Sequence, residues 1–202
     1  DTHINDGIKS RTEELSKGLS NITHTTNPPI VVITGDITDG SSSPQFIGHY
    51  SQREDNWLEY EHIKEQSGLA EVDLLVEVCG NHDMSDCPAD DDTHNLYRRH
   101  IMKPGENFSV TQIVYDDPKI PVGINFVRVN LLGPPSPAAP FGIMPYVSSD
   151  IIHSINSVLD DGRVNIIANH YPFGTYWSND KSLLSTIGKA NFVGWSHSSN
   201  NS

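Results

Sequence analysis

Short apolar runs that lead into side chains of the metal-ligand type recur three times in this chain of 202 residues. The pairs of run and following residues are 30–34 before Gly35 and Asp36, 72–79 before residues 80–83, and 164–168 before Asn169 and His170. Runs of this length, rich in β-branched residues and bounded by turn residues, predict buried strands. Because the carboxyl ends of neighbouring strands meet along one rim of an α/β sheet, the pattern predicts a layered α/β domain with its site on that rim.

The other segments alternate between helical and extended patterns. Residues 56–66 place Trp57, Tyr60 and Ile63 at helical spacing, which predicts a helix that ends near Gly68 and directs this stripe to the core rather than to a cofactor. We also expect strands at residues 112–115, 123–130 and 190–193, a helix at 149–159 and a Pro-rich turn region at 133–145.

The length of the chain fits one domain, so residues 1–202 are predicted to form a single domain. The chain begins with Asp1 rather than Met and ends in polar residues, and we therefore expect a fragment of a longer polypeptide. No run of 18 or more apolar residues occurs, so membrane association is expected only through segments outside this chain.

The charge balance argues against a nucleic-acid partner. There are 26 acidic against 13 basic residues, a formal net charge of -13, whereas binding a nucleic-acid backbone needs clustered Lys and Arg. Acidity is also compatible with a domain that gathers metal cations, because several carboxylates must then lie together. Charge alone does not decide between a solvated acidic surface and a metal site.

Other features bear on the cellular compartment. The triplets that begin at Asn21, Asn107 and Asn200 would each accept a glycan if the chain faced a secretory lumen. Cys79 and Cys87 are close enough in sequence to form a disulfide, but two thiols fit a reducing compartment equally well.

Several histidines have no motif around them. We expect each to be a surface residue or a structural residue with satisfied hydrogen bonds rather than a ligand; they are His24, His49, His62, His94, His100 and His153.

The predicted strand ends and the start of the chain supply oxygen and imidazole ligands, and the exception is Trp195. These residues are 1–3, 35–39, 80–83, 169–170 and 194–197. A pair of dications needs a bridging carboxylate together with His, Asp or Asn ligands. The absence of thiolate ligands favours a hydrolytic centre with manganese, iron, zinc or magnesium over a structural zinc site. We expect Gly35 and Gly80 to provide unusual backbone angles beside the ligands.

The motif order is D-x-H at Asp1, G-D-x-x-D at Gly35, G-N-H-D at Gly80, a lone histidine at His170, and a G-W-S-H that stands in place of G-H-x-H. In this order and over nearly the whole chain, the sequence resembles the calcineurin-like metallophosphoesterase superfamily. The resemblance implies a layered β-sandwich flanked by helices, which here lacks the strand that normally precedes D-x-H. Residues 35–97 are similar to the luminal phosphoesterase domain of a family of multispanning membrane proteins, which implies a luminal or extracellular location beside a membrane.

The resemblance also implies a role for each matching residue. Asp1, His3 and His197 would bind one metal, Asp36 would bridge two, and Asn81 with His170 would bind the second. His82 would donate a proton to the leaving oxygen or stabilise the transition state, and Asp39 or Asp83 would orient it. The implied reaction is metal-dependent hydrolysis of a phosphate mono- or diester by water that the metals activate.

Trp195 departs from the family pattern, because it replaces a histidine ligand of the second metal and an indole N–H cannot coordinate. The alternative hypothesis is therefore a degenerate phosphoesterase fold that serves as a structural or binding module, with partner subunits, in a larger membrane-associated assembly. The substrate would depend on loops at residues 46–53 and 134–146, whose shapes the sequence does not determine.

Overall fold

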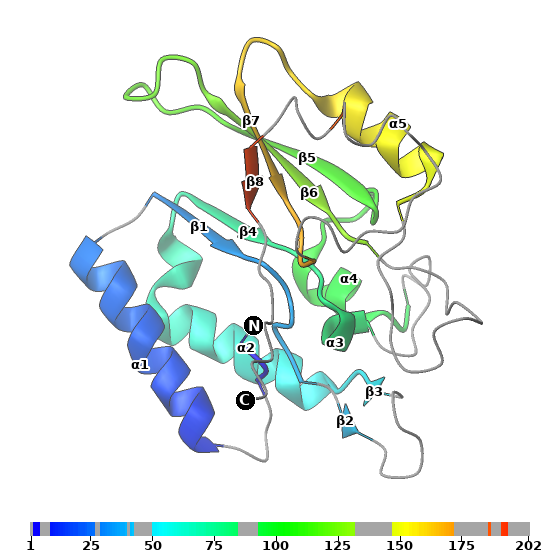
Figure 1. Ribbon diagram of the computed structural model, residues 1–202. Helices are drawn as coiled ribbons and strands as arrows, with labels where there is room; N and C mark the ends of the chain where they lie inside the picture. Colours follow the sequence, from blue (N-terminus) through cyan, green and yellow to red (C-terminus); the bar gives the residue numbers. More distant parts are fainter. Residues whose placement is uncertain are drawn as a thin grey trace, which may run out of the picture. The chain divides into compact units, whose positions relative to one another are not determined.

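A computed structural model describes residues 2–4, 9–26, 29–39, 41–42, 50–84, 93–131, 147–171, 186 and 191–193. The chain divides into two compact units, Asp1–Phe108 and Ser109–Ser202 (Figure 1). Among the described residues, the first unit contains two small sheets with several helices, and the second contains one sheet with helix α5 (Ser149–Val158). The predicted mixed α/β class, with sheets flanked by helices, is thereby confirmed.

A two-stranded parallel sheet carries the two motif loops of the first unit. Its strands are β1 (Ile30–Ile33) and β4 (Leu74–Glu77), which pair in register from Ile30 opposite Leu74 to Ile33 opposite Glu77. Both predicted strands are therefore present, although β4 is shorter than the apolar run that predicted it. Beyond them, β2 (Ser41–Ser42) pairs with β3 (Tyr50–Ser51) in an antiparallel manner.

Helix α2 (Glu54–Ser67) confirms the helix predicted for residues 56–66. Trp57 and Tyr60 are fully buried and Ile63 is nearly so, so the aromatic stripe is core, as expected. Gly68 ends the helix in the left-handed region at φ 76°, a conformation that costs glycine little. A 3₁₀ turn, η1 (Leu69–Glu71), follows.

The first unit contains three further helices: α1 (Lys9–Thr26), α3 (Asn81–Met84) and α4 (Leu96–Ile101). Helix α1 was not expected, because most of its residues are polar and its large apolar side chains are limited to Leu15, Leu19 and Ile22. It packs beside α2 (Figure 1), and the buried Thr23 hydroxyl donates to the Ser67 carbonyl at the end of α2. Tertiary contact rather than intrinsic propensity therefore stabilises this helix.

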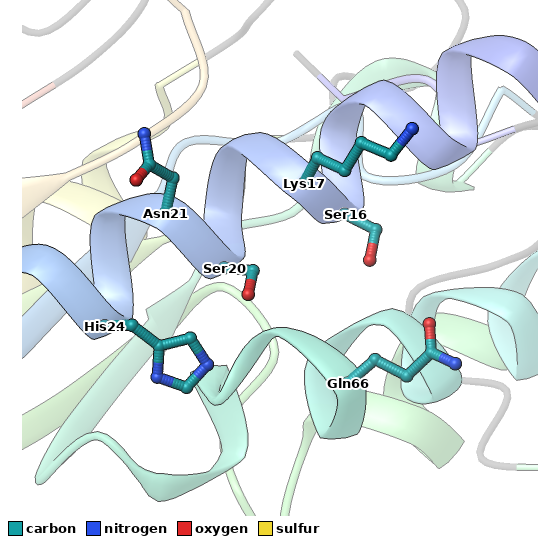
Figure 2. A pocket seen from close by; sticks show the side chains of 6 residues that line it. All are labelled: Ser16, Lys17, Ser20, Asn21, His24 and Gln66. Carbon is teal, nitrogen blue, oxygen red and sulfur yellow. The ribbon is translucent and has the colours of Figure 1, made fainter.

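A polar cavity between α1 and α2 is lined by Ser16, Lys17, Ser20, Asn21, His24 and Gln66 (Figure 2). None of these residues belongs to the metal-ligand motifs, although Asn21 begins one of the glycan-acceptor triplets.

Two buried tyrosines hold the end of β4, from which the chain continues to α3. The Tyr60 hydroxyl donates to Glu77 Oε1 at 2.6 Å, and the Tyr97 hydroxyl donates to the Glu77 carbonyl at 2.7 Å. Both tyrosines are fully buried. These two bonds therefore fix the backbone at Glu77, where β4 ends and the following loop begins.

The second unit is built on a four-stranded sheet in the order β5-β6-β7-β8. The strands are β5 (Val110–Tyr115), β6 (Ile124–Val129), β7 (Val164–Ala168) and β8 (Asn191–Val193). β5 and β6 are antiparallel, whereas β6, β7 and β8 are parallel. All four match predicted strands, within two residues at each end.

Helix α5 (Ser149–Val158) lies where the sequence predicts it and packs against this sheet (Figure 1). Ile152 and Ile155 on α5 join Val127 and Ile167 of the strands in one buried apolar cluster. The Pro-rich region predicted at 133–145 lies outside the described residues. Among the helices that the structure describes, none combines the length and the apolar character needed to cross a bilayer.

Candidate metal centre

Two ligand-type residues of the first unit hold an uncommon backbone conformation. His3 has φ 46° and Asp36 has φ 49°, and Gly35 before Asp36 has φ 93°. The left-handed region costs a non-glycine residue roughly 1–2 kcal/mol, so such residues cluster where function requires them. Gly35 thus supplies the unusual backbone angle that the sequence predicts.

The segment around His3 is tied to the loop after β1. The backbone N–H groups of Thr2 and His3 both donate to the Asp36 carbonyl at 2.9 Å, and Ile4 forms a parallel bridge with Thr38. The Thr2 hydroxyl donates to the Ile37 carbonyl at 2.6 Å. These bonds fix the His3 side chain beside the Asp36 carboxylate.

His3, Asp36 and His82 converge on one point. One ligand atom from each lies within 4.8 Å of the others, and His3 Nε2 is 3.6 Å from Asp36 Oδ2. The two imidazole rings are nearly perpendicular, with centroids 4.7 Å apart. Asp36 is buried, whereas the His3 side chain keeps a quarter of its surface exposed, so the group can be reached from solvent.

Asp39 lies behind both histidines. Its Oδ1 atom is 3.3 Å from His3 Nδ1 and 3.4 Å from His82 Nδ1, and its carbonyl is 3.1 Å from the same His82 nitrogen. A histidine that binds a metal commonly donates its second ring N–H to a carboxylate. His3, with Nδ1 on Asp39 and Nε2 toward Asp36, has that arrangement.

The acidic residue of the G-N-H-D motif, Asp83, binds backbone instead. Its fully buried carboxylate accepts the N–H groups of Thr38 and Gly80 at 2.8 Å, the N–H of Ile37 at 3.2 Å and the Thr38 hydroxyl at 3.2 Å. Asp83 therefore joins the loop after β1 to the loop after β4. Of the two carboxylates expected to orient His82, Asp39 is the one whose Oδ1 approaches the ring.

Burial shifts the proton affinity of two of these groups. It raises the pKa of Asp83 to about 6; the N–H of Thr38 opposes this shift and the charge of Asp36 adds to it. Burial also lowers the pKa of His3. The nearby Asp36 carboxylate opposes this shift, and the His82 ring adds to it. A lowered pKa favours the neutral imidazole, which is the form that binds metals.

Gly80 is required for a different reason than the sequence analysis expected. It is not among the glycines with positive φ. A Cβ atom at this position would lie 2.2 Å from both the backbone nitrogen and Oδ1 of Asp36. The prediction of an unusual backbone angle is therefore wrong at Gly80, where the need is for space between the two motif loops.

The other predicted site residues fall in different places. Asn81 opens α3 with a half-buried side chain. His170 follows β7 in the second unit, where it is buried and its ring lies 5.0 Å from that of Tyr171. Asp1, His197 and Trp195 lie outside the described residues, as does Cys87, the cysteine close in sequence to the buried Cys79.

Two residues that contact the motifs, Thr38 and Gln52, were not predicted to do so from the sequence. Thr38 donates both its N–H and its hydroxyl to Asp83, and Gln52 donates to the Asp83 carbonyl. Thr38 lies inside the G-D-x-x-D motif and could have been examined there. Gln52 belongs to no motif, and no sequence signal indicates its role.

The residues that converge in the first unit fit a divalent cation. They offer imidazole nitrogen and carboxylate oxygen without thiolate, a donor set suited to zinc, iron or manganese. The two strained positions belong to two of the three converging residues, and a carboxylate lies behind both imidazoles.

Comparison with known proteins gives a consistent result. The model of the calcineurin-like phosphoesterase family matches residues 1–198. Transmembrane protein 62 of Mus musculus is 23% identical over 181 residues, which cover 87% of this chain and 27% of that protein. The protein named "Putative metallophosphoesterase At3g03305" of Arabidopsis thaliana is 39% identical over 67 residues, 31% of this chain and 9% of that protein.

The chain therefore spans about a quarter of the length of the mouse relative. Since the family model covers nearly the whole sequence in one match, this chain belongs to the calcineurin-like phosphoesterase family.

Proposed function

We propose that this protein is a metallophosphoesterase that hydrolyses a phosphate mono- or diester. The observation that carries the proposal is the convergence of His3, Asp36 and His82 within 4.8 Å, with Asp39 placed behind both imidazoles. Family membership over residues 1–198 supports a phosphoester as the substrate class.

The proposed metal ligands follow the family motifs. Asp1, His3 and His197 would hold one divalent metal, Asp36 would bridge to a second, and Asn81 with His170 would complete the second site. When bound, such metals neutralise phosphate charge and bring the pKa of water toward neutrality. Manganese, iron, zinc and magnesium all accept this set of oxygen and nitrogen donors.

In this proposal His82 would lie beside the metals without binding one and would supply the proton for the leaving group. Asp39 lies at His82 Nδ1, so the other ring nitrogen, Nε2, can carry a proton toward the leaving oxygen. The His82 backbone N–H donates to Asp36 Oδ1 at 3.0 Å. The acid and the bridging carboxylate are thereby held at a fixed separation, which is what a reaction at one phosphorus centre requires.

Asp83 would act on this geometry through the backbone. Its carboxylate accepts N–H groups from both motif loops, so we assign it to positioning of the loops rather than to proton transfer.

The finer structural and cellular features belong to the same proposal. Residues 1–202 would form one phosphoesterase domain with a layered β-sandwich, which a single family match across both units supports. One relative is named a transmembrane protein, which supports membrane association through segments outside this chain. The proposal also includes a luminal or extracellular location, for which the family resemblance of residues 35–97 is the motive. In that compartment Asn21 and Asn107, both exposed, could carry glycans.

The test is hydrolysis by the purified protein supplied with manganese, zinc or magnesium. We expect it to cleave p-nitrophenyl phosphate or bis-p-nitrophenyl phosphate, and to lose activity in a chelator. If it cleaves neither class of ester with any of these metals, the proposal is wrong.

Trp195 supports one alternative, a degenerate fold that serves as a structural or binding module with partner subunits, because a family ligand is replaced there. The variant Trp195→His separates the two readings. A gain of metal binding or hydrolysis would indicate a decayed second site, whereas an already active parent protein would remove the motive for the alternative.

A further inference from the structure

The turn that carries His82 is short and needs external support. Helix α3 has four residues, Asn81–Met84, and a single helical turn is unstable by itself. Its amino-terminal side is fixed by the His82 N–H on Asp36 and by the Asp83 carboxylate on the loop after β1. The carbonyl groups at the carboxyl-terminal end of a helix have no partner inside that helix, so the support for this end must come from elsewhere.

Gln52 supplies that support. Its Nε2 donates to the Asp83 carbonyl, and its Oε1 accepts the Leu96 N–H at 2.7 Å. Leu96 is the first residue of α4, and the first N–H groups of a helix also lack internal partners. One amide side chain therefore joins the end of α3 to the beginning of α4, which lie next to each other (Figure 1).

The chemistry of the two partners suits an amide at this position. A carbonyl needs a donor and an N–H needs an acceptor, and the side-chain amide of Gln offers both whatever the pH. Gln52 stands two residues before α2 begins at Glu54. Trp57 in the first turns of α2 is fully buried, so packing holds the beginning of the helix that follows Gln52.

We infer that Gln52 is a positioning residue for the proposed reaction: it fixes α3 so that the His82 ring keeps its place between Asp39 and the substrate. This inference rests on the proposed function. Loss of the Gln52 amide would release the far end of the turn, and His82 would donate its proton less effectively. Gln52 itself touches neither metal nor substrate in this account.

The effect should depend on the leaving group. An ester of p-nitrophenol needs little protonation as it departs, whereas a phenyl ester needs much more. In Gln52→Ala we expect kcat for the phenyl ester to fall about tenfold, the lower end of the range for residues that orient an active group. The p-nitrophenyl ester should lose less than about threefold, and KM should stay within about twofold for both.

Two further variants control for stability and residue type. Gln52→Glu keeps an acceptor for the Leu96 N–H but places an oxygen against the Asp83 carbonyl. Like Gln52→Ala, it should lose more kcat for the phenyl ester than for the p-nitrophenyl ester. Gln66→Ala removes an exposed glutamine from the polar cavity between α1 and α2 (Figure 2) and should change neither ester. Equal losses for both esters in Gln52→Ala, or no loss in a folded variant, would overturn the inference.

Amide hydrogen exchange, measured by NMR at single residues, tests the role of Gln52 without any assay of hydrolysis. In Gln52→Glu the Leu96 amide should remain protected while the His82 amide exchanges faster, and in Gln52→Ala both should exchange faster. Unchanged protection at His82 in both variants would overturn the positioning role. Should the parent protein hydrolyse no ester, the proposed function fails and this exchange measurement still decides whether Gln52 holds the turn.

Discussion

Two groups of histidines and carboxylates lie in the first unit, and they are built differently. The site cluster consists of His3, Asp36, Asp39 and His82, on loops and on the short helix α3, and two of these residues adopt positive φ. The helix cluster consists of Glu54, Glu61, Arg99 and His100, on the regular helices α2 and α4. Similar side chains therefore occur once on a strained backbone and once on a relaxed one.

The direction of the side chains separates the two clusters. In the helix cluster, His100 Nδ1 is 2.8 Å from Glu61 and Nε2 is 3.1 Å from Glu54, so the carboxylates lie on opposite sides of the ring. The His100 ring also stacks on Trp57, with 5.7 Å between the ring centroids and 10° between the ring planes. In the site cluster, atoms of three residues converge within 4.8 Å. His3 also has a carboxylate near each ring nitrogen, so it is the convergence of three residues and the strained backbone that indicate a ligand site.

Replacing the central carboxylate of the site cluster should have the largest effect. Asn tolerates positive φ and retains an oxygen for the His82 N–H, so Asp36→Asn keeps the local fold. Metal affinity and hydrolysis should fall by more than the roughly 100-fold typical of outer-shell partners, while unfolding of the metal-free protein shifts by less than about 1 kcal/mol. The measurements are metal titration, ester hydrolysis and denaturant unfolding.

A matched change in the helix cluster provides the control. Glu61→Gln also removes one carboxylate charge beside a histidine, but it should leave metal affinity and hydrolysis unchanged. Equal losses of metal in Glu61→Gln and Asp36→Asn would contradict the distinction between the clusters.

The second largest effect is expected when the space between the two motif loops is filled. Gly80→Ala would place its methyl group against the Asp36 backbone, so we expect roughly 3 kcal/mol of lost unfolding free energy together with weaker metal binding. Gly18→Ala in α1 meets no atom within 4 Å and should stabilise the helix by about 0.5–1 kcal/mol. Chemical denaturation of both variants checks this; similar stabilities would show that the loops do not need Gly80.

The third prediction concerns pH. Burial raises the pKa of Asp83 to about 6 from an ordinary value of 3.8, so its contribution to stability is complete below pH 3.8 and is lost as the pH rises through 6. For the metal-free protein this amounts to roughly 3 kcal/mol of unfolding free energy. Asp83→Asn removes this titration, so the parent protein should exceed the variant by more at pH 4 than at pH 7. Parallel pH profiles would refute the raised pKa.

The smallest effect is expected in the helix cluster itself. His100→Ala removes two hydrogen bonds and a stacked ring, which should cost about 1–2 kcal/mol of unfolding free energy. Hydrolysis by the folded variant should be unchanged, because His100 has no part in the site. A specific loss of kcat without a loss of stability would place His100 in the reaction and remove the contrast.

The sequence predicts the elements whose apolar pattern is strong. Strands β1, β6 and β7 and helices α2 and α5 all lie where periodicity places them. Helix α1 was missed because Ser, Thr, Asn and Gly dominate it and favour other conformations, and its partner on α2 is distant in sequence. Helix α4 was missed because of its length, although Asn95, which accepts the Arg98 N–H at 3.0 Å, is a recognisable N-cap.

The sequence singles out the residues that converge at the candidate site, with His82 expected as a proton donor and not as a ligand, but it does not single out the residues that support them. His3, Asp36 and His82 follow from motif order, because the family places these residue types at strand ends. The positive φ of His3 and Asp36, the Asp83 carboxylate across two loops and the Gln52 amide arise from contacts between residues more than 30 positions apart. Such contacts depend on how the loops fold against each other, which a local pattern does not contain.

The most direct test of the central claim is metal binding to the purified protein, measured by elemental analysis and by manganese titration of the parent and Asp36→Asn. The account predicts at least one divalent metal per parent chain and loss of that metal in Asp36→Asn, while Glu61→Gln retains it. Two metals would mean that the second site is complete despite Trp195. A parent protein that binds no metal, or an Asp36→Asn variant that binds as well as the parent, would contradict the account.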